Sequence, residues 1–317
     1  MKRQQQGMAI IMALLIVALA ATAAATVLWQ QSLWWRQADN DRARADIRLI
    51  ADAGTGWAGD ILAFDARSSG AVDYLGELWA QPLPQTEAEQ TRISGQLSDA
   101  QGRFNVRNLM QQDGKPDELQ AQLYRRLLQQ LQLPAALADT LLDWLDDDND
   151  ARAQGAEADW YAALPAPYAI PPLASLRRVE QLRWVKGYTP QVLATLAPHL
   201  AVLPQRTAIN VNTASLPLLM ALVPGLGRGQ AQALANQRQS NYFKDRADFG
   251  LRLTGGLTPL AVDYGVRSDF FLLDSTIRHP RSVLRVQALL QRNEQASKVW
   301  WRDEGVVPAA AAGAGEP

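Results

Sequence analysis

An acidic segment near the middle of the chain carries the densest group of side chains able to do chemistry. In LLDWLDDDNDARAQGAEADWY, carboxylates fall at positions 1, 3, 5 and 12 when Asp146 is counted as position 1. This is the register of an EF-hand calcium loop, in which alternate residues direct oxygens inward and a glutamate closes the shell. The spacing therefore predicts a structural Ca²⁺ site. Its candidate metal ligands are Asp143, Asp146, Asp148, Asp150, Glu157 and Asp159.

The acidic segment departs from an EF-hand at position 6, where the sharp turn needs glycine and the chain has Ala151. The next glycine is Gly155, so we expect a calcium loop of another geometry. The alternative is a solvated acidic loop, but carboxylates at a helix C-terminus repel one another and need a counter-charge, for which Arg152 alone is a weak substitute. A glycosidase-like acid pair would need an apolar pocket around one acid, and this polar segment offers none.

A second motif, VPGLGRGQ, joins two predicted helices through a glycine turn. The pattern is typical of a helix-hairpin-helix unit, in which backbone N–H groups can hold a phosphate. The candidate residues for such a site are Gly225, Gly227 and Arg228. Only Arg228 and Arg238 add positive charge nearby, and aspartates follow, so we expect a structural role and keep DNA binding as the alternative.

The composition restricts the possible functions. A net charge of −1 gives no general attraction to nucleic acid. The absence of cysteine excludes disulfides, thiolate metal sites and cysteine nucleophiles. His199 and His279 are the two histidines, too few for a histidine-rich metal centre and little material for a Ser-His-Asp site. We expect a protein that is not an enzyme and has no small-molecule substrate; a membrane-anchored hydrolase is the competing interpretation.

The N-terminal stretch MKRQQQGMAIIMALLIVALAATAAATVLWQ is uncharged after Arg3 for long enough to cross a bilayer. The positive-inside rule places Lys2 and Arg3 in the cytoplasm and the chain beyond about Trp29 outside. Small residues in ATAAAT also offer a signal-peptidase site, which is the alternative. Because the helical apolar spacing continues past this point and no proline interrupts 8–67, we expect one long helix, half in lipid and half packed on an outer domain.

The rest of the chain is predicted to form strands, then helices, then strands again. Two alternating runs on either side of SDAQG predict a β-hairpin. Strands return at SDFFLLDSTI, SVLRVQALLQRN and KVWWR, so a single sheet interrupted by a helical insertion is the simplest arrangement. The helices are expected at 117–133, 135–146, 175–186, 189–200, 215–223, 228–238 and 246–253.

Together these motifs resemble the K class of type II secretion minor pseudopilins (general secretion pathway protein K). The leader KRQQQG is similar to type IV pilin-like signal sequences, and DWLDDDND, INVNTAS, PGLG and SDFFLL extend the resemblance over nearly the whole chain. The resemblance implies that a prepilin peptidase cuts between Gly7 and Met8 and that the new N-terminus is methylated.

The fold that the resemblance implies is α+β and type IV pilin-like. A long N-terminal helix would pack on a small antiparallel sheet, which carries a large all-α insertion with calcium sites and a helix-hairpin-helix, SAM-like unit. The expected divisions are a leader (1–7), a transmembrane half-helix (8–30), the first part of the pilin-like domain (31–110), the insertion (111–265, acidic up to 205 and hairpin-like from 206), the C-terminal strands (266–303) and a disordered tail (304–317).

The function that the resemblance implies is assembly. With I- and J-class minor pseudopilins, the chain would form the tip of the pseudopilus and support export of folded proteins across the outer membrane. It would cross the inner membrane once, with its N-terminus in the cytoplasm and its C-terminal domain in the periplasm.

Met12 stands at the fifth position of the expected mature chain, where most pilin-like subunits carry a glutamate. A lone carboxylate in hydrocarbon is costly, so that glutamate is thought to pair with the N-terminal ammonium of a neighbouring subunit. The K class also lacks this glutamate, so in this respect the chain resembles that class. A subunit without the glutamate is expected at an end of the filament, where it has one neighbour fewer. The alternative is that a plain membrane anchor needs no glutamate there.

Overall fold

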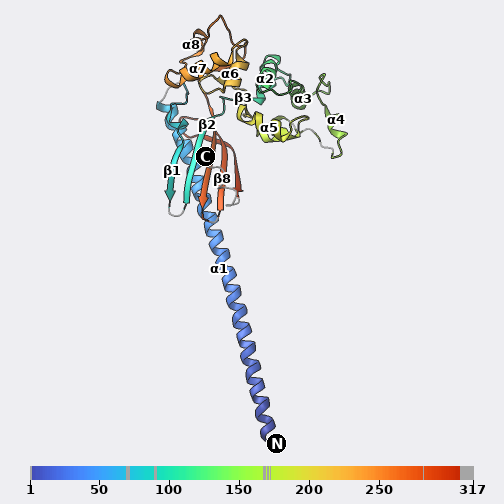
Figure 1. Ribbon diagram of the computed structural model, residues 1–317, viewed down its shortest axis with the longest axis vertical. Coiled ribbons are helices and arrows are strands. Elements are labelled where there is room, and N and C mark those ends of the chain that lie inside the picture. Colours follow the sequence, from blue (N-terminus) through green and yellow to red (C-terminus); the bar gives the residue numbers. More distant parts are fainter. Residues whose placement is uncertain are drawn as a thin grey trace.

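Helix α1 (Lys2–Ser68) is one continuous rod that runs from the N-terminal end of the molecule into its head (Figure 1). The computed structural model describes residues 2–68, 72–88, 91–166, 169, 171, 173–280 and 282–307. The first part of α1 is exposed to solvent, whereas Ile47, Ala51, Ala58 and Leu62 are buried against the sheet. These four residues recur at helical spacing and so form one face. The prediction of a long helix with two differently used halves matches this arrangement.

A five-stranded antiparallel sheet packs on the C-terminal half of α1 (Figure 1). Its spatial order is β1-β2-β7-β8-β9, so strands from both ends of the head lie side by side. The β2–β7 register pairs Leu97 with Leu273, across the point where the helical region leaves the sheet and returns. The predicted single, interrupted sheet is therefore confirmed. The strands are β1 (Leu83–Ala88), β2 (Thr91–Asp99), β7 (Phe270–His279), β8 (Ser282–Gln291) and β9 (Lys298–Val307).

The helical region lies between β2 and β7 and has its own core. Buried leucines and aromatic residues from both its halves form one hydrophobic cluster, and Arg126 of α2 donates hydrogen bonds to the carbonyl oxygens of Met220 and Ala221 in α6. The region is therefore one packed body. Its helices are α2 (Glu118–Gln130), α3 (Ala136–Leu145), α4 (Ala158–Ala162), α5 (Pro190–Leu196), α6 (Leu216–Leu222), α7 (Arg228–Ser240) and α8 (Arg246–Leu251).

Short strands and 3-10 turns complete the helical region and the loop before β1. β3 (Phe104–Asn105) pairs with β4 (Leu200–Ala201), and β5 (Ile209–Asn210) pairs with β6 (Tyr264–Gly265); both pairs are parallel. The 3-10 turns are η1 (Leu78–Ala80), η2 (Val106–Leu109), η3 (Leu173–Ser175), η4 (Val179–Trp184) and η5 (Ala197–His199).

The predicted hairpin around SDAQG is wrong. The chain does turn there, because the Asp99 carboxylate accepts a hydrogen bond from the Gln101 N–H group. However, the residues after the turn do not return along β2. Phe104 and Asn105 are buried and join β4, and the Asn105 amide donates to the Gln205 carbonyl oxygen. The segment that follows the turn thus belongs to the core of the helical region, earlier than the boundary expected at 110.

Two other expectations differ from the structure. The helix expected at 175–186 is a pair of 3-10 turns, because the Gln181 side chain accepts the N–H groups of Arg177 and Arg178 at 2.7 and 2.9 Å and interrupts the α-helical pattern. Strand β9 continues to Val307, past the boundary expected at 303. The rest of the expected tail, 308–317, lies outside the described residues.

Candidate functional site

The acidic segment begins at the C-terminal end of α3. Leu141, Leu142 and Leu145 bury this end of the helix in the core, and Asp143 is carried into the interior with 1% of its surface exposed. Asp146 ends the helix in an extended conformation, and the following loop leads to α4 through Glu157. The apolar spacing of α3 therefore fixes where the acidic loop starts.

Three of the predicted ligands converge. Each of Asp146, Asp148 and Glu157 places one carboxylate oxygen within 4.8 Å of the others. In the part of the chain that the structure describes, Asp146 Oδ1 and Glu157 Oε1 are buried and have no hydrogen-bond partner. Such oxygens are costly to bury unless something binds them, and hard divalent cations prefer carboxylate oxygens. The donor set fits a Ca²⁺ ion.

Asp143 instead faces an arginine. Arg152 Nη1 lies 2.7 Å from Asp143 Oδ1 and 2.9 Å from Asp146 Oδ2, and the Arg152 N–H group donates to Asp143 Oδ2. One guanidinium thus links two of the predicted ligands, so Arg152, expected to be a weak substitute for the counter-charge of the loop, supplies part of it. Asp150 and Asp159 are exposed and lie outside the group of three. The Asp150 N–H group donates a hydrogen bond to Asp148 Oδ1 at 2.9 Å.

Gly155 has a role different from that of an EF-hand glycine. A Cβ atom at this position would lie 1.6 Å from Asp143 Oδ2, so only glycine leaves room for the buried carboxylate. Its carbonyl oxygen accepts a hydrogen bond from Lys186 Nζ, which also lies 5.2 Å from the Trp160 ring centre. The loop is therefore tied to the segment after η4, a contact that no local spacing indicated.

The electrostatics of the acidic loop favour a cation. Burial, together with the neighbouring Asp143, Asp146 and Asp148 carboxylates, raises the pKa of Glu157 to about 7. Burial also raises the pKa of Asp146, although Arg152 opposes the shift. Both shifts mean that negative charge is disfavoured here without an added positive partner.

The glycine turn between α6 and α7 uses its own groups internally. Gly225 has a φ of +82°, which explains glycine at this turn. The Gly227 N–H group donates to the Gln230 side chain, so this amide is not free for phosphate. Arg238 is buried and donates to the carbonyl oxygens of Val211 and Ala214, whereas Arg228 is exposed. The geometry therefore favours a structural role and gives little support to DNA binding.

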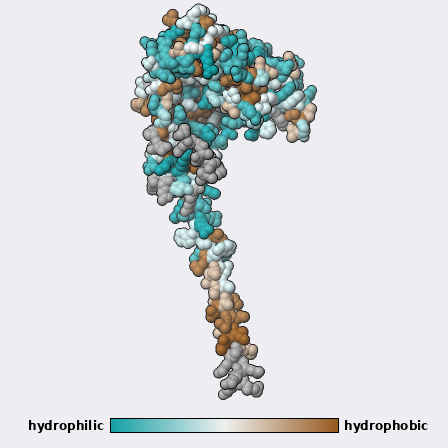
Figure 2. All heavy atoms as spheres, in the orientation of Figure 1, coloured by the Kyte–Doolittle hydropathy of each residue, from teal (hydrophilic) through white to brown (hydrophobic). Residues whose placement is uncertain are grey.

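Helix α1 is the one described helix whose length and apolar character suit a membrane crossing. Figure 2 shows its apolar surface as a brown band on the lower rod, well apart from the polar head. Gly7 and Met8 lie within this helix, and Met12 is 63% exposed. Among the residues that the structure describes, none covers this apolar part of α1.

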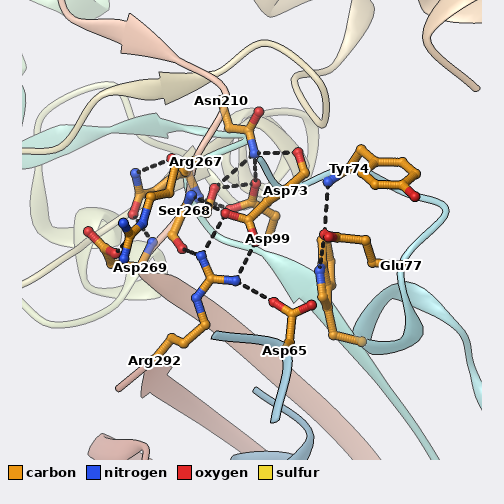
Figure 3. Close-up of polar contacts among 12 residues, drawn as sticks. Asp65, Asp73, Tyr74, Glu77, Asp99, Asn210, Arg267, Ser268, Asp269 and Arg292 are labelled. Atoms are coloured by element: carbon orange, nitrogen blue, oxygen red, sulfur yellow. Dashed lines mark hydrogen bonds and ion pairs between the residues drawn. The ribbon is translucent and has the colours of Figure 1, made fainter. Parts of the chain in front are cut away.

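A second acidic group, which sequence reasoning missed, lies where the helical region meets α1 and the sheet (Figure 3). Asp65, Asp73 and Glu77 each place one carboxylate oxygen within 4.8 Å of the others. The Arg292 guanidinium binds Asp65 at 2.5 Å, forks onto both oxygens of Asp73, and donates to the Ser268 carbonyl oxygen. Arg292 and Ser268 lie about 200 residues after the three carboxylates, so no local spacing could have grouped them. We call Asp65, Asp73, Glu77, Asp99, Asn210, Ser268 and Arg292 the junction network.

Comparisons with known proteins agree with this architecture. Two family models described as "Type II secretion system (T2SS), protein K" match residues 102–205 and 209–267. Type II secretion system protein K of Pseudomonas aeruginosa is 31% identical and aligns over 96% of this chain and 94% of its own length. The protein of the same name from Pectobacterium carotovorum is 30% identical over 96% and 98%.

A solved structure shares the fold. The crystal structure of the GspK-GspI-GspJ complex from enterotoxigenic Escherichia coli contains a chain that superposes with a TM-score of 0.72 at 23% sequence identity. The match covers 85% of this chain and 99% of that one. The sequence matches and the shared mixed fold, with its long N-terminal helix and antiparallel sheet, show that this chain belongs to the type II secretion system protein K family.

Proposed function

We propose that this chain is a minor pseudopilin that caps the pseudopilus and supports export of folded proteins across the outer membrane. The observation that carries the proposal is the form of α1, one rigid helix with an exposed apolar first half and a second half buried against the sheet. A filament subunit needs such a shaft, because the apolar half can pack on neighbouring helices while the sheet holds the head in place. The interrupted sheet supports a type IV pilin-like fold, and the glycine turn supports a helix-hairpin-helix unit within the insertion.

The proposed location follows from the same helix. The first half of α1 would cross the inner membrane once, with Lys2 and Arg3 on the cytoplasmic side and the head in the periplasm. Met12 supports a position at the filament end, since this subunit offers no carboxylate to a neighbour's N-terminal ammonium. The proposed role is one of assembly, without a catalytic step.

The mature N-terminus tests the pilin interpretation. We expect mass spectrometry of the membrane-extracted protein to find a chain that starts at Met8 and carries one added methyl group on its amino group. A Gly7→Leu variant should remain unprocessed, because the peptidase would no longer find its glycine. A mature chain that starts near Ala25 would instead show signal-peptidase cleavage and contradict the proposal.

The partners are proposed by analogy with the solved relative, which was crystallised as the GspK-GspI-GspJ complex. We expect the full-length chain to co-purify from detergent extracts with the I- and J-class minor pseudopilins of its own secretion system. A major pseudopilin expressed at the same level serves as the control. Purification of an I–J pair that does not contain this chain would argue against the tip complex.

We also propose that the acidic loop binds calcium as a structural ion. Asp146, Asp148 and Glu157 would hold it, and Asp143, Asp150 and Asp159 remain predicted ligands close by in sequence. The support is the convergence of three carboxylates and the two buried, unpartnered oxygens among them. When bound, the ion would add to the single positive charge of Arg152 and fix α3 relative to α4.

A further inference from the structure

The junction network is a buried polar connection between the helical region and the rest of the head (Figure 3). The Asn210 side-chain amide, from β5, lies within hydrogen-bond distance of Asp99 Oδ2, Ser268 Oγ and the Asp73 carbonyl oxygen, at 2.9, 3.0 and 3.1 Å. Nearby, the Tyr74 ring stacks on Tyr242, which follows α7, with ring centres 4.1 Å apart. Changes in this network therefore act on how the helical region is held.

The network contains more negative than positive charge. Asp65, Asp73, Glu77 and Asp99 are all buried, and Arg292 pairs with two of them, Asp65 and Asp73. Arg103 interacts electrostatically with Asp99, so Glu77 is the member without a cation partner among the described residues. A buried carboxylate without such compensation is costly to keep ionised. At least one of the four carboxyl groups is expected to hold a proton over part of the physiological pH range.

The hydrogen bonds indicate which carboxyl group holds it. Asp99 accepts from the hydroxyls of Thr213 and Ser268 and from the Gln101 N–H group, in addition to Asn210. Asp73 accepts the Arg292 fork and the Ser268 N–H group. Burial raises the pKa of both groups, and these strong donors oppose that rise because they stabilise the charged forms.

The charged form of Glu77 receives weaker hydrogen bonds. Its Oε2 atom accepts from two neutral donors, the Tyr74 N–H group at 3.1 Å and the Trp79 indole N–H at 2.7 Å. Arg292 makes no ion pair with it among the described residues, whereas Asp65 and Asp73 lie beside it. Two like charges next to a carboxylate with only neutral donors favour its neutral form.

We propose that Glu77 is the proton-binding member of the junction network, and that loss of its proton loosens the attachment of the helical region to α1 and the sheet. The added charge would face Asp65 on α1 and Asp73 on the same loop, whose own cation partner is Arg292 after β8. Tyr74 is the other titratable group against Glu77, and Tyr242 stacks on the Tyr74 ring. The junction is thus a pH-sensitive latch, independent of the proposed place in the pseudopilus.

The pH range over which the junction loosens follows from the direction of the shift in the pKa of Glu77. Burial, then the charges of Asp65 and Asp73, raises the pKa of Glu77 from 4.5 to about 7, against the hydrogen bonds from Trp79 and Tyr74. The folded state therefore holds this proton more tightly than the unfolded chain does. The resulting stabilisation is fully present below pH 4.5 and declines as the pH rises towards about 7.

A Glu77→Gln variant tests the latch, since glutamine keeps an oxygen for Tyr74 and Trp79 and stays neutral. Hydrogen exchange of the full-length chain in detergent micelles is measured by mass spectrometry at about pH 5.5 and about pH 8, with peptides over 72–80 and 264–270. We expect wild type to open more readily than the variant at the higher pH. The ratio of the wild-type opening constant to that of the variant should rise by up to about tenfold per pH unit between pH 4.5 and about 7. Comparison at equal pH cancels the intrinsic exchange rate and the other titrating groups.

Glu87→Gln is the matched control, because Glu87 is exposed and pairs with Arg92 on the sheet edge. It removes the same charge and should leave exchange in 72–80 unchanged at both pH values. The wild-type chain provides a second readout without any variant: protection in 72–80 should fall with rising pH relative to α6, whose sequence has no titratable residue. A Glu77→Gln chain that opens as wild type does at the higher pH, or a wild type whose 72–80 protection follows α6, would overturn the proposal.

Discussion

Replacement of Arg292 by methionine is expected to lower the free energy of unfolding by about 3–5 kcal/mol, the usual cost of leaving a buried charge without its partner. Methionine keeps the apolar contact with the Phe271 ring, over which the guanidinium lies at 5.2 Å, but it leaves Asp65 and Asp73 unpaired. Guanidinium unfolding of the full-length chain in detergent micelles would measure the change. Tryptophan fluorescence is a suitable signal because Trp79 is buried beside the junction.

Arg285→Met is the matched control for this prediction. Arg285 pairs with Asp274 at 2.5 Å across β7 and β8, but both side chains are about half exposed, so we expect a loss of less than about 1 kcal/mol. Adding Asp65→Asn and Asp73→Asn to Arg292→Met should recover part of the lost stability, since the uncompensated charges disappear. Similar losses for Arg285→Met and Arg292→Met would show that the junction network is not a buried ionic centre.

The long helix and the β7–β8 pair could be predicted because their signals are local. Apolar residues such as Ile47, Ile50 and Ile61 continue the membrane segment at helical spacing, and alternation marks the two strands. Trp57 and Phe64 follow the same spacing but are about half exposed, because the buried face runs through Ala51, Ala58 and Leu62. The turn at SDAQG is also a local signal, but a turn does not specify which partner the chain meets next. Burial of Phe104 in the core of the helical region decided that outcome.

The acidic loop was partly predictable for the same reason. The register that points to calcium depends on residues only a few positions apart, and Asp146, Asp148 and Glu157 do converge. The bridge from Arg152 to Asp143 depends on the course of the loop and has no signature in the spacing. The junction network is the extreme case, because only the sheet topology brings Arg292 to Asp65 and Asp73.

Gly155→Ala is expected to remove most of the stabilisation that calcium gives to the head. In wild type, Ca²⁺ at about 100 times its dissociation constant should add about 2.7 kcal/mol to the free energy of unfolding, a gain that EGTA removes and Mg²⁺ restores poorly. In the variant, the new Cβ atom would meet Asp143 Oδ2 at 1.6 Å, in a buried end of α3 where Arg152 holds that carboxylate through its N–H and guanidinium groups. The loop would have to move instead, and Glu157, two residues on, would move away from Asp146 and Asp148.

Gly229→Ala separates this effect from that of any added methyl group. A Cβ atom at Gly229, in the first turn of α7, would meet no heavy atom within 4 Å, so alanine should raise stability by about 0.5–1 kcal/mol and leave the calcium response intact. Thermal unfolding of the three full-length chains, with Ca²⁺ and with EGTA, gives the comparison. The same melting temperature for wild type with Ca²⁺ and with EGTA would contradict the calcium proposal itself. A full calcium response in Gly155→Ala would leave the ion in place but show that its ligands do not depend on the close approach of Asp143 to the loop.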